Sequence, residues 1–351
     1  ASVLFIALSS GFIQAQAPSF WTDAELSPQR QVQIETKTFR ALELDQLSLR
    51  STLEDASLMD QIDPTQSSLF LTLPLPEGGE ATFKIAEAPV MAAELQARFP
   101  GIRSYKGVGI DDQAQQVHFD LTPAGFHAMI FRNGSTVFID PSPQEGLPNL
   151  HISYTREAFY KGTSKTWEGC EVGEEVTTTT PQVKHQGNFP IQMGMQRFPS
   201  PTLPFETESG NELRTYRLAL ACTGEYAAFH GGTIEGALAA MNTSMVRING
   251  VFERDVAIRM VMVANNDQLI FLDSGSDPYT NNSGGTMLDE NIATCNGVIG
   301  SANYDIGHVF STGGGGVAFL QSPCGSNKAG GVTGQGSPVG DPFDIDYVCH
   351  E

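Results

Sequence analysis

The feature that most constrains the fold is a strand–helix–strand succession in residues 214–264. Residues 214–222 (RTYRLALAC) alternate apolar and polar side chains and then become wholly apolar, as a strand entering a sheet does. Thr233 can cap the helix that follows, and residues 256–264 are a continuous apolar run typical of a central strand. The helix has apolar residues at steps of three and four: Ile234, Leu238, Met241, Met245, Ile248 and Phe252. This succession predicts an α/β sheet with at least one parallel crossover.

More strands and a terminal helix complete this half of the chain. We expect strands at residues 305–310, 316–320 and 331–333, and a helix that begins at Asp341. Asp341 suits the N-cap, Pro342 suits the first helical position, and Asp344 in the first turn complements the helix dipole. In an α-helix, Phe343, Tyr347 and His350 would share the face turned toward the domain.

The first half has a different pattern. A helical opening is expected at residues 39–45 and 47–53. It is followed by hairpins that join residues 69–73 to 81–85 and residues 117–121 to 126–130. Asn133-Gly134 is a hairpin turn between two further apolar segments. We therefore interpret residues 18–170 as a β-rich unit. Residues 171–210 are polar and then rich in proline, which indicates an exposed linker.

Residues 1–17 are a short apolar run that ends in Ala-Gln-Ala, the pattern of a signal-peptidase site. The alternative is a buried N-terminal helix. A signal peptide predicts a secreted, extracellular protein, in an environment that permits disulfides. The chain has five cysteines, an odd number, so at least one needs an explanation other than pairing within this chain.

The charge of the chain argues against two classes of partner. Its 40 acidic and 20 basic residues give a formal net charge of −20, which repels nucleic acid and anionic lipid. Beyond residue 17, no stretch has the roughly 18 apolar residues that a membrane span needs.

The last two residues, His350 and Glu351, could open an H-E-x-x-H zinc motif on the terminal helix. Two histidines of that motif bind zinc from one helix face, and the glutamate acts as general base. The dipeptide alone is more typical of an ordinary polar helix end than of a zinc motif. His308 in a predicted strand and His230 beside Gly231-Gly232 are better interpreted as structural residues than as metal ligands.

Context strengthens the zinc interpretation. From residue 214 onward the chain resembles the reprolysin-like metzincins of exported bacterial proteins, and residues 39–140 are similar to the propeptides of such enzymes. The segments that carry the resemblance are residues 216–222, the helix from Thr233 to its end in residues 246–255, residues 303–310, the glycines of 313–316, residues 328–332, and residues 341–343 before His350-Glu351.

The resemblance implies a role for several positions. His350 matches the first zinc ligand and Glu351 the general base, whereas the other two histidine ligands are missing from this sequence. Gly316, Val317 and Ala318 lie where metzincins have the edge strand that binds substrate; a plain sheet edge is the alternative. Cys170 lies where a propeptide thiol could block the metal, with a structural or intermolecular disulfide as the alternative. The family also admits Ca²⁺, for which no residue is assigned.

The expected fold is α+β overall: a signal peptide in 1–17, a β-rich propeptide in 18–170, a linker in 171–210, and an incomplete metzincin-like α/β catalytic domain in 211–351. The catalytic domain should have a mixed twisted sheet and long helices. The expected function is a zinc-dependent endopeptidase zymogen that acts on proteins and is inhibited by its own propeptide. The chain is expected to be truncated inside its zinc motif and inactive as it stands. Maturation could occur at Lys184 or Arg197. The alternatives are a non-catalytic surface or adhesion protein and a metzincin-like pseudoenzyme.

Overall fold

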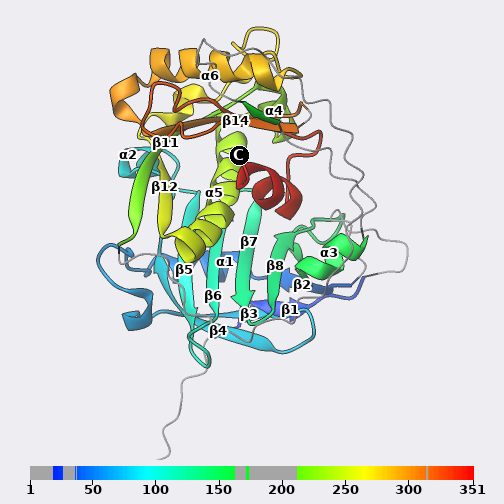
Figure 1. The fold of residues 1–351 in the computed structure, drawn as a ribbon. Coiled ribbons are helices and arrows are strands. Elements are labelled where there is room, and N and C mark those ends of the chain that lie inside the picture. Colours follow the sequence, from blue (N-terminus) through cyan, green and yellow to red (C-terminus); the bar gives the residue numbers. More distant parts are fainter. Residues whose placement is uncertain (1–18, 27–35, 37, 163–170, 174–211, 314) are drawn as a thin grey trace, which may run out of the picture.

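The computed structural model describes residues 19–26, 36, 38–162, 171–173, 212–313 and 315–351. They form a β-rich N-terminal domain and a C-terminal α/β domain, so the α+β fold class expected from the sequence is confirmed. In Figure 1 the long helix α5 (Ile234–Val256) lies between the two sheets. No helix in the described part of the chain has both the length and the apolar composition to span a membrane.

Within the described residues, the N-terminal sheet has nine strands in the order β1-β2-β9-β8-β7-β6-β5-β4-β3, and every neighbouring pair is antiparallel. The strands are β1 Trp21–Asp23, β2 Arg40–Leu44, β3 Phe70–Pro74, β4 Glu80–Glu87, β5 Arg103–Gly109, β6 Gln116–Thr122, β7 Gly125–Arg132, β8 Ser135–Pro141 and β9 Leu150–Thr155. The helical segments beside them are α1 Gln46–Leu53, η1 Pro64–Gln66, α2 Ala93–Arg98 and α3 Arg156–Gly162.

The predicted hairpins are confirmed, and the expected helix at residues 39–45 is wrong. Arg40–Leu44 is strand β2, in which Leu42 and Leu44 are buried and Glu43 between them is exposed. This alternation of period two, together with pairing to β1 and β9, favours a strand over a helix. Helix α1 begins after Asp45, whose carboxylate accepts a hydrogen bond from the backbone N–H of Ser48.

The N-terminal sheet curls so that its two ends meet. Arg40 of β2 donates to the carbonyl of Gly79 in the β3–β4 turn at 2.8 Å, and Ser153 of β9 donates to the carbonyl of Pro74 at 3.0 Å. The curled sheet encloses a core rich in aromatic and aliphatic side chains, among them Phe83, Phe119 and Phe126.

The C-terminal domain is built on a mixed sheet in the order β10-β14-β15-β13-β11-β12. Its elements among the described residues are β10 Glu171–Gly173, β11 Arg214–Cys222, α4 Gly224–Phe229, α5, β12 Ile258–Met262, η2 Asn266–Leu269, α6 Gly284–Val298, η3 Ser301–Asn303, β13 Ile306–Ser311, β14 Gly315–Phe319, β15 Gly331–Gly334 and η4 Pro342–Val348. β14 and β15 pair antiparallel, whereas the other neighbours pair in parallel.

The predicted crossover is confirmed. β11 and β12 pair in parallel, α5 connects them, and Thr233 accepts a hydrogen bond from the backbone N–H of Gly236 at the helix start. The helix is longer than the sequence suggests, because it continues to Val256 and ends at Ala257, which has a left-handed φ of 54°. The strand expected from residue 256 therefore begins at Ile258.

Segments from the first half of the chain pair with both edges of this sheet. The backbone of Val90 and Ala92 exchanges two hydrogen bonds of 2.8 Å with Met262 of β12. At the opposite edge, β10 pairs in parallel with β14. Val90, Met91 and Leu95 also belong to the same hydrophobic core as α5 and β11, so the two domains share a core.

Candidate functional site

The terminal helix η4 is wound as a π-helix over Pro342–Val348. Gly340 has a φ of +76°, and its carbonyl accepts hydrogen bonds from the backbone N–H groups of Phe343 and Asp344. Asp341 lies at the N-cap position and Pro342 at the helix start, as expected, but the Asp341 side chain makes no capping bond and forms an ion pair with Arg156 instead. π-Helical turns are rare and occur frequently at functional sites.

The winding changes which residues share a face. Phe343 and Tyr347 are buried as expected, but His350 is exposed, so the expectation that it faces the domain is wrong. A π-helix has more residues per turn than an α-helix, which takes the seventh residue after Phe343 away from its face. Phe343 anchors the helix in an aromatic cluster, 5.1 Å from Phe310 and 6.2 Å from Tyr226 between ring centroids.

Glu351 lies against strand β14. A Cβ atom added to Gly316 would be 2.7 Å from the Glu351 carboxylate carbon, so only glycine leaves room for this approach. The backbone N–H groups of His350 and Glu351 both point to the carbonyl of Tyr347 at 3.1 Å. The structure thus brings Glu351 to the strand that was predicted to bind substrate, while the His350 side chain points to solvent.

Strand β14 is not the outermost strand of the sheet. Gly316, Val317 and Ala318 pair with β15 on one side, and Val317, Ala318 and Phe319 pair with β10 on the other. β10 comprises the first three residues of the predicted linker, which here extend the sheet. Cys170, which precedes β10 directly, lies outside the described residues.

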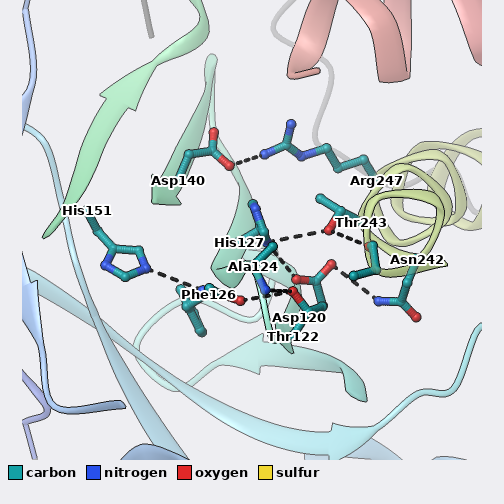
Figure 2. Close-up of polar contacts among 12 residues, drawn as sticks. Asp120, Thr122, Ala124, Phe126, His127, Asp140, His151, Asn242, Thr243 and Arg247 are labelled. Carbon is teal, nitrogen blue, oxygen red and sulfur yellow. Dashed lines mark hydrogen bonds and ion pairs between the residues drawn. The ribbon is translucent and has the colours of Figure 1, made fainter. Parts of the chain in front are cut away.

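A buried ionic network lies behind the terminal helix. Arg247 of α5 donates to Asp344 of η4 at 2.9 Å and to Asp140 of β8 at 2.5 Å. Ser244 donates to the other oxygen of Asp344, and the hydroxyl of Tyr154 donates to Asp140 at 2.6 Å. Figure 2 shows Asp140 and Arg247 facing each other across the domain boundary.

The pKa shifts of Asp344 and Arg247 follow from burial and from the position of one arginine between two carboxylates. Burial raises the pKa of Asp344, and Arg247 only partly opposes that rise. Burial by itself lowers the pKa of Arg247, but Asp140 and Asp344 together raise it above its usual value, so the guanidinium stays charged.

A second group of polar side chains lies beside this network, around a small cavity at the domain interface. Its lining includes His118, Asp120, His127, Thr243 and Arg247. The His127 ring and the Asp120 carboxylate are 2.9 Å apart, and Thr243 of α5 approaches the same ring nitrogen at 3.4 Å (Figure 2). The cavity has almost no room for a ligand, so the group serves the contact between domains.

Sequence reasoning missed the network of Arg247, Asp140 and Asp344. Asp344 was interpreted only as a complement to the helix dipole, and Arg247 was passed over within a helix assigned from its apolar stripe. The available signal was a charged residue between Val246 and Ile248, on the part of α5 that is buried almost all round. An arginine there needs an acidic partner.

The described residues do not by themselves form a metal site. Apart from the undescribed ranges, no group of three or more His, Cys, Asp or Glu side chains is placed to hold an ion. His308 is buried in β13, 2.8 Å from the Thr333 hydroxyl, and burial lowers its pKa to about 4. His230 is also largely buried, with its pKa lowered to about 4. Of the cysteines that the structure describes, Cys222, Cys295, Cys324 and Cys349 are all free thiols.

The chain was compared with protein families, with curated protein sequences and with solved structures. No curated protein sequence matches the chain. Among solved structures, the fold is similar to metalloproteinase-II from Bacteroides fragilis, with 11% sequence identity and a TM-score of 0.42 over 85% of this chain and 84% of that one. Residues 212–351 match the model of the reprolysin-like metallopeptidases of family M12B. The C-terminal domain of this chain is therefore similar to the reprolysin-like metallopeptidases of family M12B over residues 212–351.

Proposed function

We propose that this domain acts as a zinc-dependent endopeptidase in which His350 donates one metal ligand, Glu351 is the general base, and β14 binds the substrate. The observation that carries the proposal is the approach of the Glu351 carboxylate to Gly316 of β14, within a domain that matches a metallopeptidase family. A general base beside a strand that can pair with an extended peptide is the arrangement that peptide hydrolysis requires.

The metal itself needs more donors than the described residues offer. They supply one imidazole at the expected place, so they do not fit a zinc ion without further ligands, and we derive no zinc-dependent step from them. We expect the 351-residue chain alone to bind zinc weakly and not to cut protein. No residue is proposed for Ca²⁺.

The residues of this chain define what the site contributes. The backbone of Gly316, Val317 and Ala318 would align a peptide as an added strand. Glu351 would take a proton from the attacking water and pass it to the leaving amine. The Gly316→Ala variant tests this arrangement, because its methyl group would displace the Glu351 carboxylate. In a chain with a complete zinc motif we expect kcat to fall about 10-fold or more. Gly285→Ala in α6, where an added Cβ meets nothing, should be neutral.

Latency is the second part of the proposal: a secreted zymogen in which the N-terminal domain blocks the site until the chain is cut within residues 171–210. Strand β10 supports it, because β10 occupies the side of β14 where an extended substrate would pair. We further propose that the Cys170 thiol, one residue before β10, reaches the metal. Cys170→Ser should then raise activity before processing, and an unchanged activity would contradict that role.

The metal proposal is tested by zinc binding. The chain of 351 residues is compared with a chain that continues through the residues encoded after Glu351, each with a His350→Ala counterpart, and bound zinc is measured after dialysis. We expect stoichiometric zinc only in the longer chain, and its loss in His350→Ala. If the encoded continuation lacks x-x-His-x-x-Gly-x-x-His, or binds no zinc, the domain is a pseudoenzyme.

A further inference from the structure

The terminal helix carries three carboxylates, and each has an arginine partner on another element. Asp341 and Asp346 both pair with Arg156, the first residue of α3, at 2.9 Å. Asp344 pairs with Arg247 of α5, also at 2.9 Å. The helix that leads into His350 and Glu351 is therefore held by charged contacts before those two residues are reached.

Both arginines connect this helix to the N-terminal domain. Arg156 belongs to that domain, since α3 follows β9 without a break. Arg247 belongs to the C-terminal domain, but its second terminal nitrogen is bound by Asp140 of β8. The N-terminal domain thus contacts the helix once directly and once through a relay.

The geometry makes these contacts restraining. A guanidinium is planar and rigid, so an arginine that binds two carboxylates five residues apart fixes their separation on the helix. The Asp341 side chain is only 3% exposed, and a buried carboxylate needs its partner. Asp344 and Arg247 are equally inaccessible, so water cannot easily replace either group.

We propose that the N-terminal domain restrains the terminal helix, which leads into His350 and Glu351, through Arg156 and through the Asp140–Arg247–Asp344 relay. The assignment of this helix as the active-site helix rests on the proposed function, whereas the restraint itself does not. Separation of the domain would remove the Arg156 contacts of Asp341 and Asp346 and the Asp140 contact of Arg247. The domain then controls the position of the helix as well as access to the cleft.

Hydrogen–deuterium exchange in the 351-residue chain tests the restraint, because it needs neither zinc nor substrate. Arg156→Gln should speed exchange of the backbone amides of residues 342–351 on the order of fivefold, and Asp140→Asn about 10-fold or more. Arg98→Gln is the control: it breaks the Arg98–Asp267 ion pair, which also joins the two domains but does not involve the helix. It should change exchange in 342–351 by less than about twofold.

The outcomes are distinct. The proposal is overturned if Arg156→Gln is folded by circular dichroism and residues 342–351 exchange as in the wild type. It is also overturned if Arg98→Gln accelerates them as much, since the effect would then reflect general loosening of the interface. Should Asp140→Asn fail to fold, Arg156→Gln alone decides. A chain that never cuts protein can still show the expected change in hydrogen exchange. Failure of the proposed function can therefore be distinguished from failure of the restraint.

Discussion

Arg247 and Arg156 both form ion pairs with the terminal helix, but Arg247 is buried and Arg156 is partly exposed. The side chain of Arg247 is 3% exposed, and those of its partners Asp140 and Asp344 are 5% and 4% exposed. The side chain of Arg156 is 39% exposed, and those of its partners Asp341 and Asp346 are 3% and 30% exposed. A buried pair loses much when one partner is removed, whereas an exposed pair is screened by water. We therefore expect the free energy of unfolding to depend mainly on Arg247. The ion pairs of Arg156 with the terminal helix should break more easily.

The largest effect is expected from Arg247→Met. It leaves two buried carboxylates without their cation and should lower the free energy of unfolding by about 3–5 kcal/mol, as measured by urea denaturation. Arg254→Met, on the same helix but in an exposed pair with Asp255, should cost no more than about 1 kcal/mol. An equal loss of unfolding free energy in Arg247→Met and Arg254→Met would contradict the view that the buried pairs of Arg247 stabilise the protein more than an exposed pair.

A combined variant sharpens the same point. If the loss in Arg247→Met comes from uncompensated carboxylates, adding Asp140→Asn and Asp344→Asn should recover a large part of it, about 1–3 kcal/mol. Urea denaturation of the triple variant beside Arg247→Met measures the recovery. No recovery would mean that the arginine contributes by packing alone.

A pH effect of about 2 kcal/mol is expected at the same domain interface. Burial lowers the pKa of His118 to about 3; the facing charge of Glu253 opposes this shift, whereas those of Lys106, Arg259 and Arg254 add to it. Because the unfolded chain then binds the proton more readily, stability falls as the pH drops below about 6.5. Between pH 7 and pH 5, His118→Leu should lose about 2 kcal/mol less than the wild type in urea denaturation.

His127 is the control of opposite sign. Burial by itself lowers its pKa, but Asp120 raises it above the usual value overall. That stabilisation is complete below the unfolded pKa of about 6.5 and is lost as the pH rises through the folded value. His127→Gln should therefore lose relatively more stability at pH 5 than at pH 8. The same pH dependence in both variants would contradict the assignment.

The smallest effect on global stability is expected from Arg156→Gln. Asp341 is buried, but the guanidinium that pairs with it and with Asp346 is more than a third exposed, so water screens both pairs and they should contribute no more than about 1 kcal/mol to the free energy of unfolding. Differential scanning calorimetry should show a melting temperature close to that of the wild type, even though exchange in the terminal helix increases. A large drop would place Arg156 with Arg247 rather than in contrast to it.

The sequence predicted the elements whose pattern is local. The crossover from β11 through α5 to β12 follows from periodicity and the Thr233 cap, and the Asn133-Gly134 turn follows from its two residues. The helix predicted at residues 39–45 was wrong, because leucines at 42 and 44 suit either a helix or a strand. Pairing with β1 and β9 makes the segment a strand. The pairing of β10 with β14 joins residues more than 140 positions apart, and no local pattern encodes it.

The site shows the same division. His350 and Glu351 were located by a motif, and the structure brings Glu351 close to Gly316 of β14; the roles of these residues stay predictions. The Asp140–Arg247–Asp344 relay required three elements from two domains to be placed together, which the single sequence could not supply. The π-winding of the last helix was not predicted either; the helix start contacts Arg156 and the aromatic cluster, which come from distant parts of the sequence.

The most direct test of the account concerns Glu351 in a chain extended by x-x-His-x-x-Gly-x-x-His, which completes the proposed zinc motif. Hydrolysis of a protein substrate and bound zinc are measured together for the wild type, Glu351→Gln and the exposed control Glu94→Gln. We predict that Glu351→Gln keeps stoichiometric zinc but cuts at least about 100-fold more slowly, while Glu94→Gln matches the wild type. Hydrolysis by Glu351→Gln at the wild-type rate would contradict the central claim.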